Sequence, residues 1–403
     1  MELFWLEHKK LWRKKIVKIC VLLCFVYYVI FGSILSFQWF SFGSSDDYTS
    51  AFGNNFDGYT VIKDSQEYAL SFGGELTDET LQKIVSDYQQ MEADGMEEEL
   101  EKTDWQIVNS WLGTLYPELR DTSNYKTMIS YVDPDKLTGF YERRQQVLDE
   151  FLEVSGQVGA EKEFLHQIER KVEKPFRYEW VEGWSTLLGS MVADLGVVMA
   201  LFLGIVLSSL FAGEWHDNTS TLVLTTRNGW GKIALAKILT GLAFTVELFA
   251  LLAVSSVISQ LFFMGTAGWD MPIQNIKLIA VAPMNMLQAE IYEYAFVLLG
   301  AIGFAGIVMF ISAAVKNNVL TLLLSLTVVY GPMMIAEYLP YGMQKALDLI
   351  PLVGSSTDIF RTNTFRIFGK LIWSPYLLIT IPVLIGILCM PFAIKSWSRR
   401  MKA

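Results

Sequence analysis

Few residues in this chain have the types and spacing that catalysis requires. The three histidines, His8, His166 and His216, lie in different regions of the sequence, so they predict neither a metal cluster nor a catalytic triad. The nearest approach to a phosphate-binding loop is Gly229-Trp230-Gly231-Lys232, which lacks the first glycine at the required offset and a Ser or Thr after the lysine. We therefore expect no nucleotide site, no metal, no cofactor and no enzymatic activity in this chain.

Two carboxylates, Asp194 and Glu247, stand inside long apolar runs. An unpaired charge within a membrane costs on the order of 3 kcal/mol, so such residues are candidates for substrate or proton binding. Two are few for an ion-coupled carrier, which needs a relay of such groups. Glu247 could touch substrate, carry a proton, or pair with a hydroxyl such as Thr240 or Ser255 or with a group on a neighbouring helix. Asp194 could simply be hydrated.

A polar connector from Gly213 to Lys237 lies between two apolar runs. It has an acid at its start, a Ser- and Thr-rich middle with Leu222 and Leu224, and then Arg227 before the apolar residues resume. Such a segment can form a short amphipathic helix whose apolar residues enter a docking groove. On periodicity alone, docking to another protein and anchoring to lipid headgroups are equally good interpretations.

Membrane-spanning helices are the elements that must position these residues. The chain is 52% hydrophobic, and its apolar residues come in blocks. Because about 20 apolar residues cross the hydrocarbon layer as a helix, the sequence predicts six crossings. These are Ile16 to Phe40, Leu187 to Phe211, Ile238 to Phe263, Tyr294 to Val315, Val319 to Ala336, and Trp373 to Ala393. The first block is too long for a cleavable signal and is expected to remain as an anchor.

The orientation of these crossings follows from the short loops. With the N-terminus inside, the inner segments hold fourteen Lys and Arg residues and the short outer loops hold five. Because short inner loops are rich in these residues, both termini are predicted to be cytoplasmic. Residues 394–403 would then form a cytoplasmic tail. The outer segment 339–372 is expected to hold a pair of short helices in or near the outer leaflet.

An acidic extracellular domain is predicted over residues 41–184, between the first two crossings. It has 30 acidic and 13 basic residues, a net charge of −17, whereas the rest of the chain is at +7, which argues against nucleic acid as a partner. Helical spacing is expected after Thr77 and Thr103, from Asp133-Pro134 onward, and from Ala160 to about Glu173. A short strand could lie at Tyr59 to Lys63. The fold class predicted is thus an all-α membrane protein with a mainly helical extracellular domain.

One feature of the fourth crossing concerns packing. Gly300, Gly303 and Gly306 recur at intervals of three. Such a surface lets another helix approach closely.

The polar connector resembles the one that follows the second crossing in permease subunits of the type-2 ABC exporter family. The resemblance is carried by Phe211 to Glu214, Asn218 to Leu222, Leu224 to Arg227, and Lys232-Ile233 with Ala236-Lys237. Asn218-Thr219 replaces the usual Gly-Thr pair, and no proline precedes Arg227. The six-crossing layout, the basic N-terminus and the entry to the second crossing at Pro175 to Trp184, similar to permeases of Gram-positive bacteria, extend the resemblance over most of the chain.

The resemblance implies a partner and a role for the connector. The segment from Glu214 to Arg227 would form a coupling helix inserted into a cleft of a separate ABC ATPase subunit, which binds the ATP and magnesium. The coupling residues carried over are Glu214, Asn218, Thr219, Leu222, Leu224 and Arg227. The amphipathic helix from Met1 to Lys15 would lie along the membrane and contact the same ATPase. Two permease subunits, identical or related, would face each other in the lipid bilayer.

The expected function is therefore a permease subunit of an ATP-driven exporter in the plasma membrane of a Gram-positive bacterium. An amphiphilic substrate, such as a peptide antimicrobial, a lipid or a drug, would suit the large outer domain, as in resistance to antimicrobial peptides. Two alternatives stay open. One is a membrane sensor or scaffold whose outer domain detects a ligand without transport, and the other is an ion-coupled secondary carrier.

Overall fold

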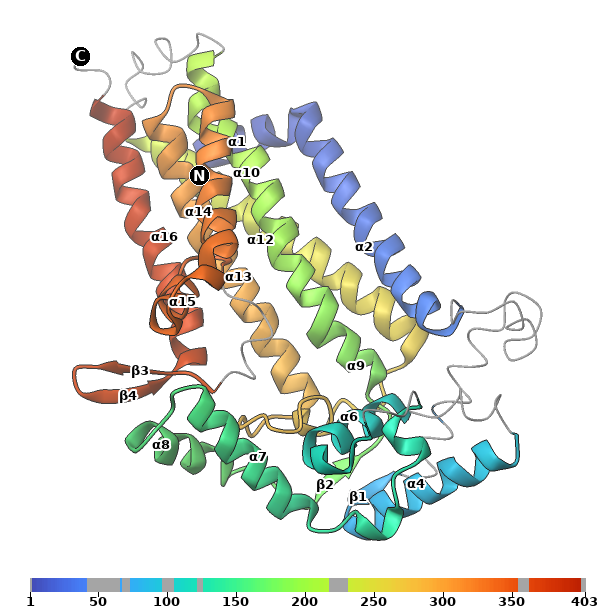
Figure 1. The fold of residues 1–403 in the computed structure, drawn as a ribbon. Helices are drawn as coiled ribbons and strands as arrows, with labels where there is room; N and C mark the ends of the chain where they lie inside the picture. The colour runs from blue at the N-terminus through green and yellow to red at the C-terminus, as the bar shows by residue number, and fades with distance from the viewer. Residues whose placement is uncertain are drawn as a thin grey trace.

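A helical bundle and a polar lobe make up the fold (Figure 1). The computed structural model describes residues 2–41, 66, 73–95, 105–121, 126–216, 231–353 and 362–399. The polar lobe comprises the described residues between 73 and 180. Helix α1 (Glu2–Arg13) and the last turns of α16 (Ser374–Arg399) lie at the end of the bundle away from the lobe, here called the termini end. The opposite end is the lobe end.

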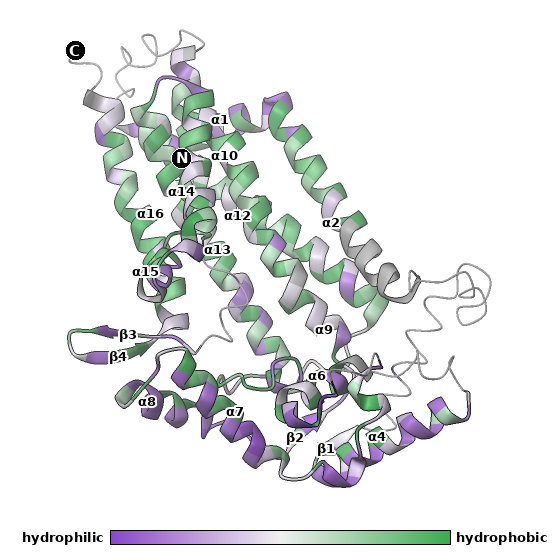
Figure 2. Cartoon of the chain, viewed as in Figure 1, coloured by the Kyte–Doolittle hydropathy of each residue, from purple (hydrophilic) through white to green (hydrophobic). Residues whose placement is uncertain are grey.

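Five helices among the described residues are long and apolar enough to cross a membrane, which indicates a membrane protein (Figure 2). They run over Glu182–Trp215, Lys232–Met264, Met286–Ala314, Asn318–Tyr338 and Ser374–Ser398. These helices match the last five predicted crossings. Helix α2 (Lys15–Ser41) covers the first predicted crossing, and its crossing of the membrane stays a prediction.

The apolar helices extend beyond the predicted crossings. The first of the five combines α9 (Glu182–Thr186), a π-helical turn (Leu187–Met191) and α10 (Val192–His216). It is followed by α12 (Lys232–Met264), α13 (Met286–Ala314), α14 (Asn318–Ile335) and α16. Residues 213–216 and 232–237 of the predicted connector are thus helical turns of α10 and α12. Much of the predicted tail is likewise helical and belongs to α16, where Trp397 is fully buried.

The glycine surface predicted in the fourth crossing is confirmed at two of its three residues. A Cβ atom on Gly303 or Gly306 would overlap backbone atoms of Pro382 or Gly386 on α16, so the two helix backbones touch directly. Gly300 lies instead against Leu352. The small residues therefore bring α13 and α16 together at closer range than side chains would permit.

The polar lobe is built from short helices. It contains α4 (Asp78–Ala93), α6 (Trp105–Leu115), α7 (Phe140–Val154) and α8 (Ala160–Glu169). Its apolar core lies among α4, α6 and the start of α7, whereas Leu148, Leu152 and Leu165 pack with the core of the bundle. Three 3₁₀ turns lie at Pro117–Leu119, Met128–Ser130 and Pro134–Lys136. Thr77 caps α4 by accepting a hydrogen bond from the Thr80 amide at 3.2 Å, as its sequence predicts.

Two helix boundaries predicted in the lobe were wrong. The helix expected from Asp133-Pro134 begins instead at Phe140, because the Asp78 carboxylate accepts hydrogen bonds from the amides of Gly139 and Phe140 at 2.7 and 2.9 Å. The helix expected to reach Glu173 ends at Glu169. The strand considered at Tyr59 to Lys63 lies outside the described residues.

Two small antiparallel sheets add to the helices. Strand β1 (Gly74–Leu76) pairs with β2 (Phe176–Tyr178), which brings the two ends of the lobe together. Between the last two apolar helices, α15 (Tyr341–Leu347) matches one of the two expected short helices, and residues 354–361 lie outside the described residues. The hairpin of β3 (Thr364–Ile367) and β4 (Lys370–Trp373) was not predicted. Phe368 and Gly369 form the hairpin tip with φ angles of 49° and 78°, the left-handed geometry that a two-residue turn requires.

A buried arginine fastens the polar lobe to the bundle. Arg144 of α7 is 0% exposed and donates to the carbonyls of Leu278 and Ala280, in the connection between α12 and α13, at 2.6 and 3.1 Å. Its charge is balanced by Glu169 at 2.6 Å, which also binds Lys174 at 2.8 Å. Burial would raise the pKa of Glu169, but the hydrogen bonds and charges of Lys174 and Arg144 outweigh it, so the pKa lies below its usual value.

Candidate coupling site at the termini end

Helix α1 packs across the first half of α12 and joins α2 directly. Leu11 is 1% exposed and enters the bundle core, whereas Trp5 and Leu6 remain more than 60% exposed. This division is the amphipathic pattern of a helix with one face on protein and one face free. The buried face of α1 carries charged side chains as well, and these meet α10 and α12.

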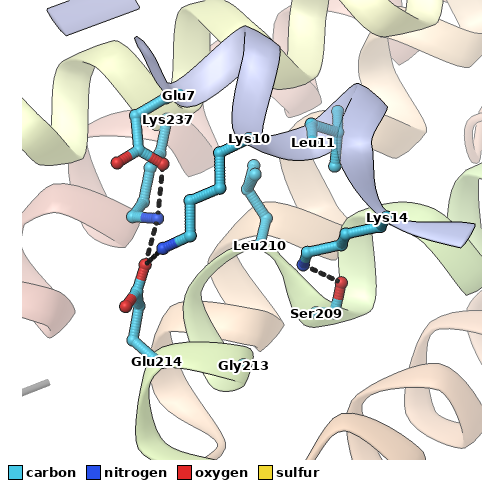
Figure 3. A pocket seen from close by; sticks show the side chains of 9 residues that line it. All are labelled: Glu7, Lys10, Leu11, Lys14, Ser209, Leu210, Gly213, Glu214 and Lys237. Atoms are coloured by element: carbon cyan, nitrogen blue, oxygen red, sulfur yellow. Dashed lines mark hydrogen bonds and ion pairs between the residues drawn. The ribbon is translucent and has the colours of Figure 1, made fainter. Parts of the chain in front are cut away.

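Four charged residues from three helices form one connected network (Figure 3). The Nζ atom of Lys10 lies 2.6 Å from Oε1 of Glu214, and the Nζ atom of Lys237 lies 2.8 Å from the same oxygen. Lys237 also binds Oε2 of Glu7 at 2.8 Å. The network thus ties the last turn of α10 to the second turn of α12 and both to α1.

The burial of this network makes its pairing essential. The side chains of Glu214 and Lys237 are 4% and 2% exposed, while that of Lys10 is 50% exposed. Moving an ion out of water costs several kcal/mol unless a partner of opposite charge compensates. Two carboxylates and two ammonium groups balance here, so loss of one member leaves a buried charge with incomplete compensation.

The space inside the network is too small for a substrate. The cavity lined by these side chains, Lys14, Ser209 and Gly213 has a volume of about 20 Å³, close to that of one water molecule. Lys14 closes one side by donating to the Ser209 hydroxyl at 2.9 Å. The arrangement is therefore a structural joint rather than a ligand pocket.

Glu247 forms a second contact between α12 and α1. Its carboxylate lies 3.2 Å from Nε2 of His8 and accepts a hydrogen bond from Nε1 of Trp12 at 3.0 Å. The Trp12 ring also packs edge-on against Phe244, with 5.8 Å between ring centroids. The sequence left several interpretations of Glu247 open. The structure shows one of them, in which Glu247 pairs with groups on a neighbouring helix, α1.

Asp194 has one polar partner on α2. The Tyr27 hydroxyl donates to its Oδ2 atom at 3.4 Å, and the residue is half-buried. Asp194 and Glu247 therefore contact different helices, α2 and α1 respectively.

The other side of the last turn of α10 is fixed by aromatic packing. Trp215 and Phe211 both pack edge-on against Trp397, with centroid separations of 6.1 and 5.5 Å. The Lys316 ammonium lies 4.4 Å from the centre of the Trp215 ring. Ser312 of α13 accepts hydrogen bonds from the amides of Phe211 and Ala212 at 3.1 Å. The point where the connector leaves α10 is therefore held on two sides.

Of the six predicted coupling residues, the structure describes one. Glu214 lies in the last turn of α10 rather than in a separate connector helix. The other five, Asn218, Thr219, Leu222, Leu224 and Arg227, lie outside the described residues. The structure shows that both helical ends of the connector, residues 213–216 and 232–237, are held in the bundle by buried charges and aromatic packing.

Sequence reasoning missed several buried charges. Lys10, Lys237 and Glu7 were not grouped with Glu214, because their partners are more than 200 positions away or on another helix. Glu290 and Glu293 were placed outside the fourth crossing, yet they lie in α13 and are 3% and 0% exposed.

A capping box could have placed the start of α13 correctly. Asn285 accepts a hydrogen bond from the Gln288 amide at 2.9 Å, and the Gln288 side chain accepts one from the Asn285 amide at 3.2 Å. An Asn followed three positions later by Gln is the sequence signature of such a start.

Within the described ranges, no group of three or more His, Cys, Asp or Glu side chains is placed to hold a metal ion. Comparison with known proteins supplies no relative: no family model, no curated protein and no solved structure matches this chain.

Proposed function

We propose that this chain is the permease subunit of an ATP-driven exporter, with the connector between α10 and α12 docked on a separate ATPase subunit. The termini end would face the cytoplasm and the polar lobe the exterior of a Gram-positive cell. Two such subunits, identical or related, would form the path for an amphiphilic peptide, lipid or drug. The ATPase partner would bind the ATP and magnesium.

The observation that carries this proposal is the buried network of Glu7, Lys10, Glu214 and Lys237. It holds together the two helices from which the connector emerges and joins them to α1. A force applied to the connector would therefore move α10, α12 and α1 together, and α1 continues into α2. Such a joint suits a segment that receives mechanical work from a partner.

The experiment is affinity purification of the full chain from its native membrane, followed by reconstitution into vesicles. We expect an ATPase chain to copurify and substrate movement to require ATP. Charge reversal at Glu214 or Arg227 should leave ATP hydrolysis active but uncouple it from export. Lys370→Glu, at the lobe end, is the matched control and should leave coupling unchanged. Export by the purified chain alone, with no motor present, would overturn the proposal.

The second candidate function is that of a sensor. The contact between Arg144 and the α12–α13 connection favours it. Because Arg144 binds two carbonyls of the α12–α13 connection, a ligand that moved the lobe would also move the bundle. Deleting the lobe separates the two functions. Loss of a signalling response with export retained would favour the sensor, whereas loss of export would favour handling of the substrate by the lobe.

A further inference from the structure

An apolar groove lies between α2 and α12, outside the coupling site. Its volume is about 610 Å³. Phe25 and Val29 of α2 line one wall, and the face of α12 between Ala250 and Phe263 lines the other. The two helices lie side by side. A volume of several hundred cubic ångströms matches that of small-molecule sites.

With α2 crossing the membrane as predicted, this groove would face hydrocarbon. Val254, Ile258 and Phe262 on its rim are 55%, 61% and 75% exposed. Its only polar side chains, Ser255 and Ser259, donate to carbonyls of their own helix at 2.7 and 3.0 Å. The groove therefore offers no unpaired polar group, and a hydrocarbon chain fits its chemistry.

Two residues of opposite charge lie beyond the groove lining, one on each helix. Glu247 shares a helix face with Leu251, Val254 and Ile258, because it precedes them by four, seven and eleven positions. Lys18 precedes Phe25 by seven positions and so shares its face of α2. Glu247 and Lys18 are both exposed, and both lie on the side of the groove toward the termini end.

The length of the apolar wall fits a lipid. From Leu248 to Phe263, α12 has no charged residue, a stretch of about 24 Å at 1.5 Å per residue. One leaflet of a bilayer occupies about half of a 30 Å hydrocarbon core. An acyl chain that starts beside Glu247 would therefore lie within this wall along its whole length.

We propose that the groove binds one zwitterionic phospholipid with an amine headgroup, from the leaflet at the termini end. The ammonium group would pair with Glu247 and the phosphate with Lys18, while an acyl chain lies between α2 and α12. This groove is separate from the network of Glu7, Lys10, Glu214 and Lys237. Lipid binding in the groove does not depend on an ATPase partner. It would make the packing of α1 against Glu247 sensitive to the lipid.

Photolabelling tests the groove. The purified full chain is reconstituted into vesicles that contain phosphatidylethanolamine with a diazirine in its acyl chain, and labelled peptides are mapped by mass spectrometry. We expect about one probe per chain, on α2 and on residues 250–263. Ala250→Trp, which fills the groove from an exposed position, should lower this labelling by about tenfold. Val254→Trp should do the same, whereas Leu323→Trp on the exposed face of α14 should not.

The headgroup is tested with a second probe. Glu247→Gln should weaken labelling by the ethanolamine probe about two- to fivefold, as for a partly exposed ion pair, and leave labelling by a phosphatidylglycerol probe of the same chain unchanged. Lys18→Gln should weaken both. Equal labelling of the groove and of α14 would identify ordinary boundary lipid and refute the proposal. Crosslinks between two copies of the chain at Phe262 would refute it as well, since a second subunit would then fill the groove.

Discussion

Replacing Glu214 by Gln tests the energetic role of the coupling site. The change keeps the shape and the hydrogen-bonding oxygen but removes the negative charge that Lys10 and Lys237 share. The pair with Lys10 contributes at most about 1 kcal/mol, because half of the Lys10 side chain is exposed. The buried hydrogen bond from Lys237 to Glu214 joins two charged groups, and a bond of this type contributes about 1.5–3 kcal/mol to stability. Gln at position 214 would retain part of this contribution. That bond joins α10 to α12, whereas the pair with Lys10 joins Glu214 to α1, so we expect α1 to be held less tightly by about 1 kcal/mol.

Thiol labelling measures this change directly. Leu11, which is 1% exposed, is replaced by Cys in a chain whose three native cysteines are changed to alanine. When opening and closing are fast, the labelling rate reports the population in which α1 has left the bundle. A loss of about 1 kcal/mol raises this rate about fivefold. A Cys at Leu165 in the lobe, which is 0% exposed, is the control and should keep its rate.

A double variant makes the test specific. Lys237→Met alone should also raise the rate, because it removes the pair between Lys237 and Glu7 that joins α12 to α1. With both changes present, neither buried charge of the pair remains, so the effect should be smaller than the sum of the two single effects. An unchanged Leu11 labelling rate in Glu214→Gln, or strictly additive effects, would refute the role assigned to this network.

Three further changes test the packing and the lobe. Gly306→Ala should disrupt the α13–α16 contact and lower the free energy of unfolding in detergent by about 1–3 kcal/mol. Gly196→Ala should not, because a Cβ atom at Gly196 meets nothing within 4 Å. Arg144→Met should increase amide exchange across residues 276–282, and the adjacent Arg143→Met should have a much smaller effect, since Arg143 is partly exposed and Arg144 is fully buried. The folded-state pKa of Glu169 is lowered from 4.5, so ionised Glu169 stabilises the lobe above pH 4.5, and this stabilisation is lost as the pH falls through the lower folded pKa. In Glu169→Gln the lobe should no longer lose this stability at acidic pH. Circular dichroism as a function of pH measures the change.

The apolar helices and the glycine surface were predictable because they depend on local composition. An uninterrupted apolar run is sufficient to place a membrane helix, and five of the six predicted crossings correspond to such helices. The spacing of Gly303 and Gly306 likewise indicates a close helix contact without knowledge of the partner. In both cases the sequence signal lies within one segment.

The helix ends and the charged network were not predictable in the same way. The third and fourth predicted crossings begin directly after Lys237 and Glu293, but both residues lie inside their helices and are buried within protein. The partners of Lys237 are 23 and 230 positions away. The start of α7 at Phe140 depends similarly on Asp78, which is 62 positions earlier. These contacts exist only once the chain has folded, so no local pattern contains them.

Helix α12 connects the two ends of the molecule and therefore decides how they communicate. Its first half is bound to α1 and α10 through Lys237 and Glu247, and its far end leads into the connection that Arg144 holds. If α12 moves as a rigid rod, loosening the network at Glu214 should raise amide exchange at residues 276–282 as well. If it bends, exchange should rise only in α1 and the first half of α12. An exporter that drives the lobe from the connector requires the first result, whereas a lobe that only sits on the membrane is compatible with the second.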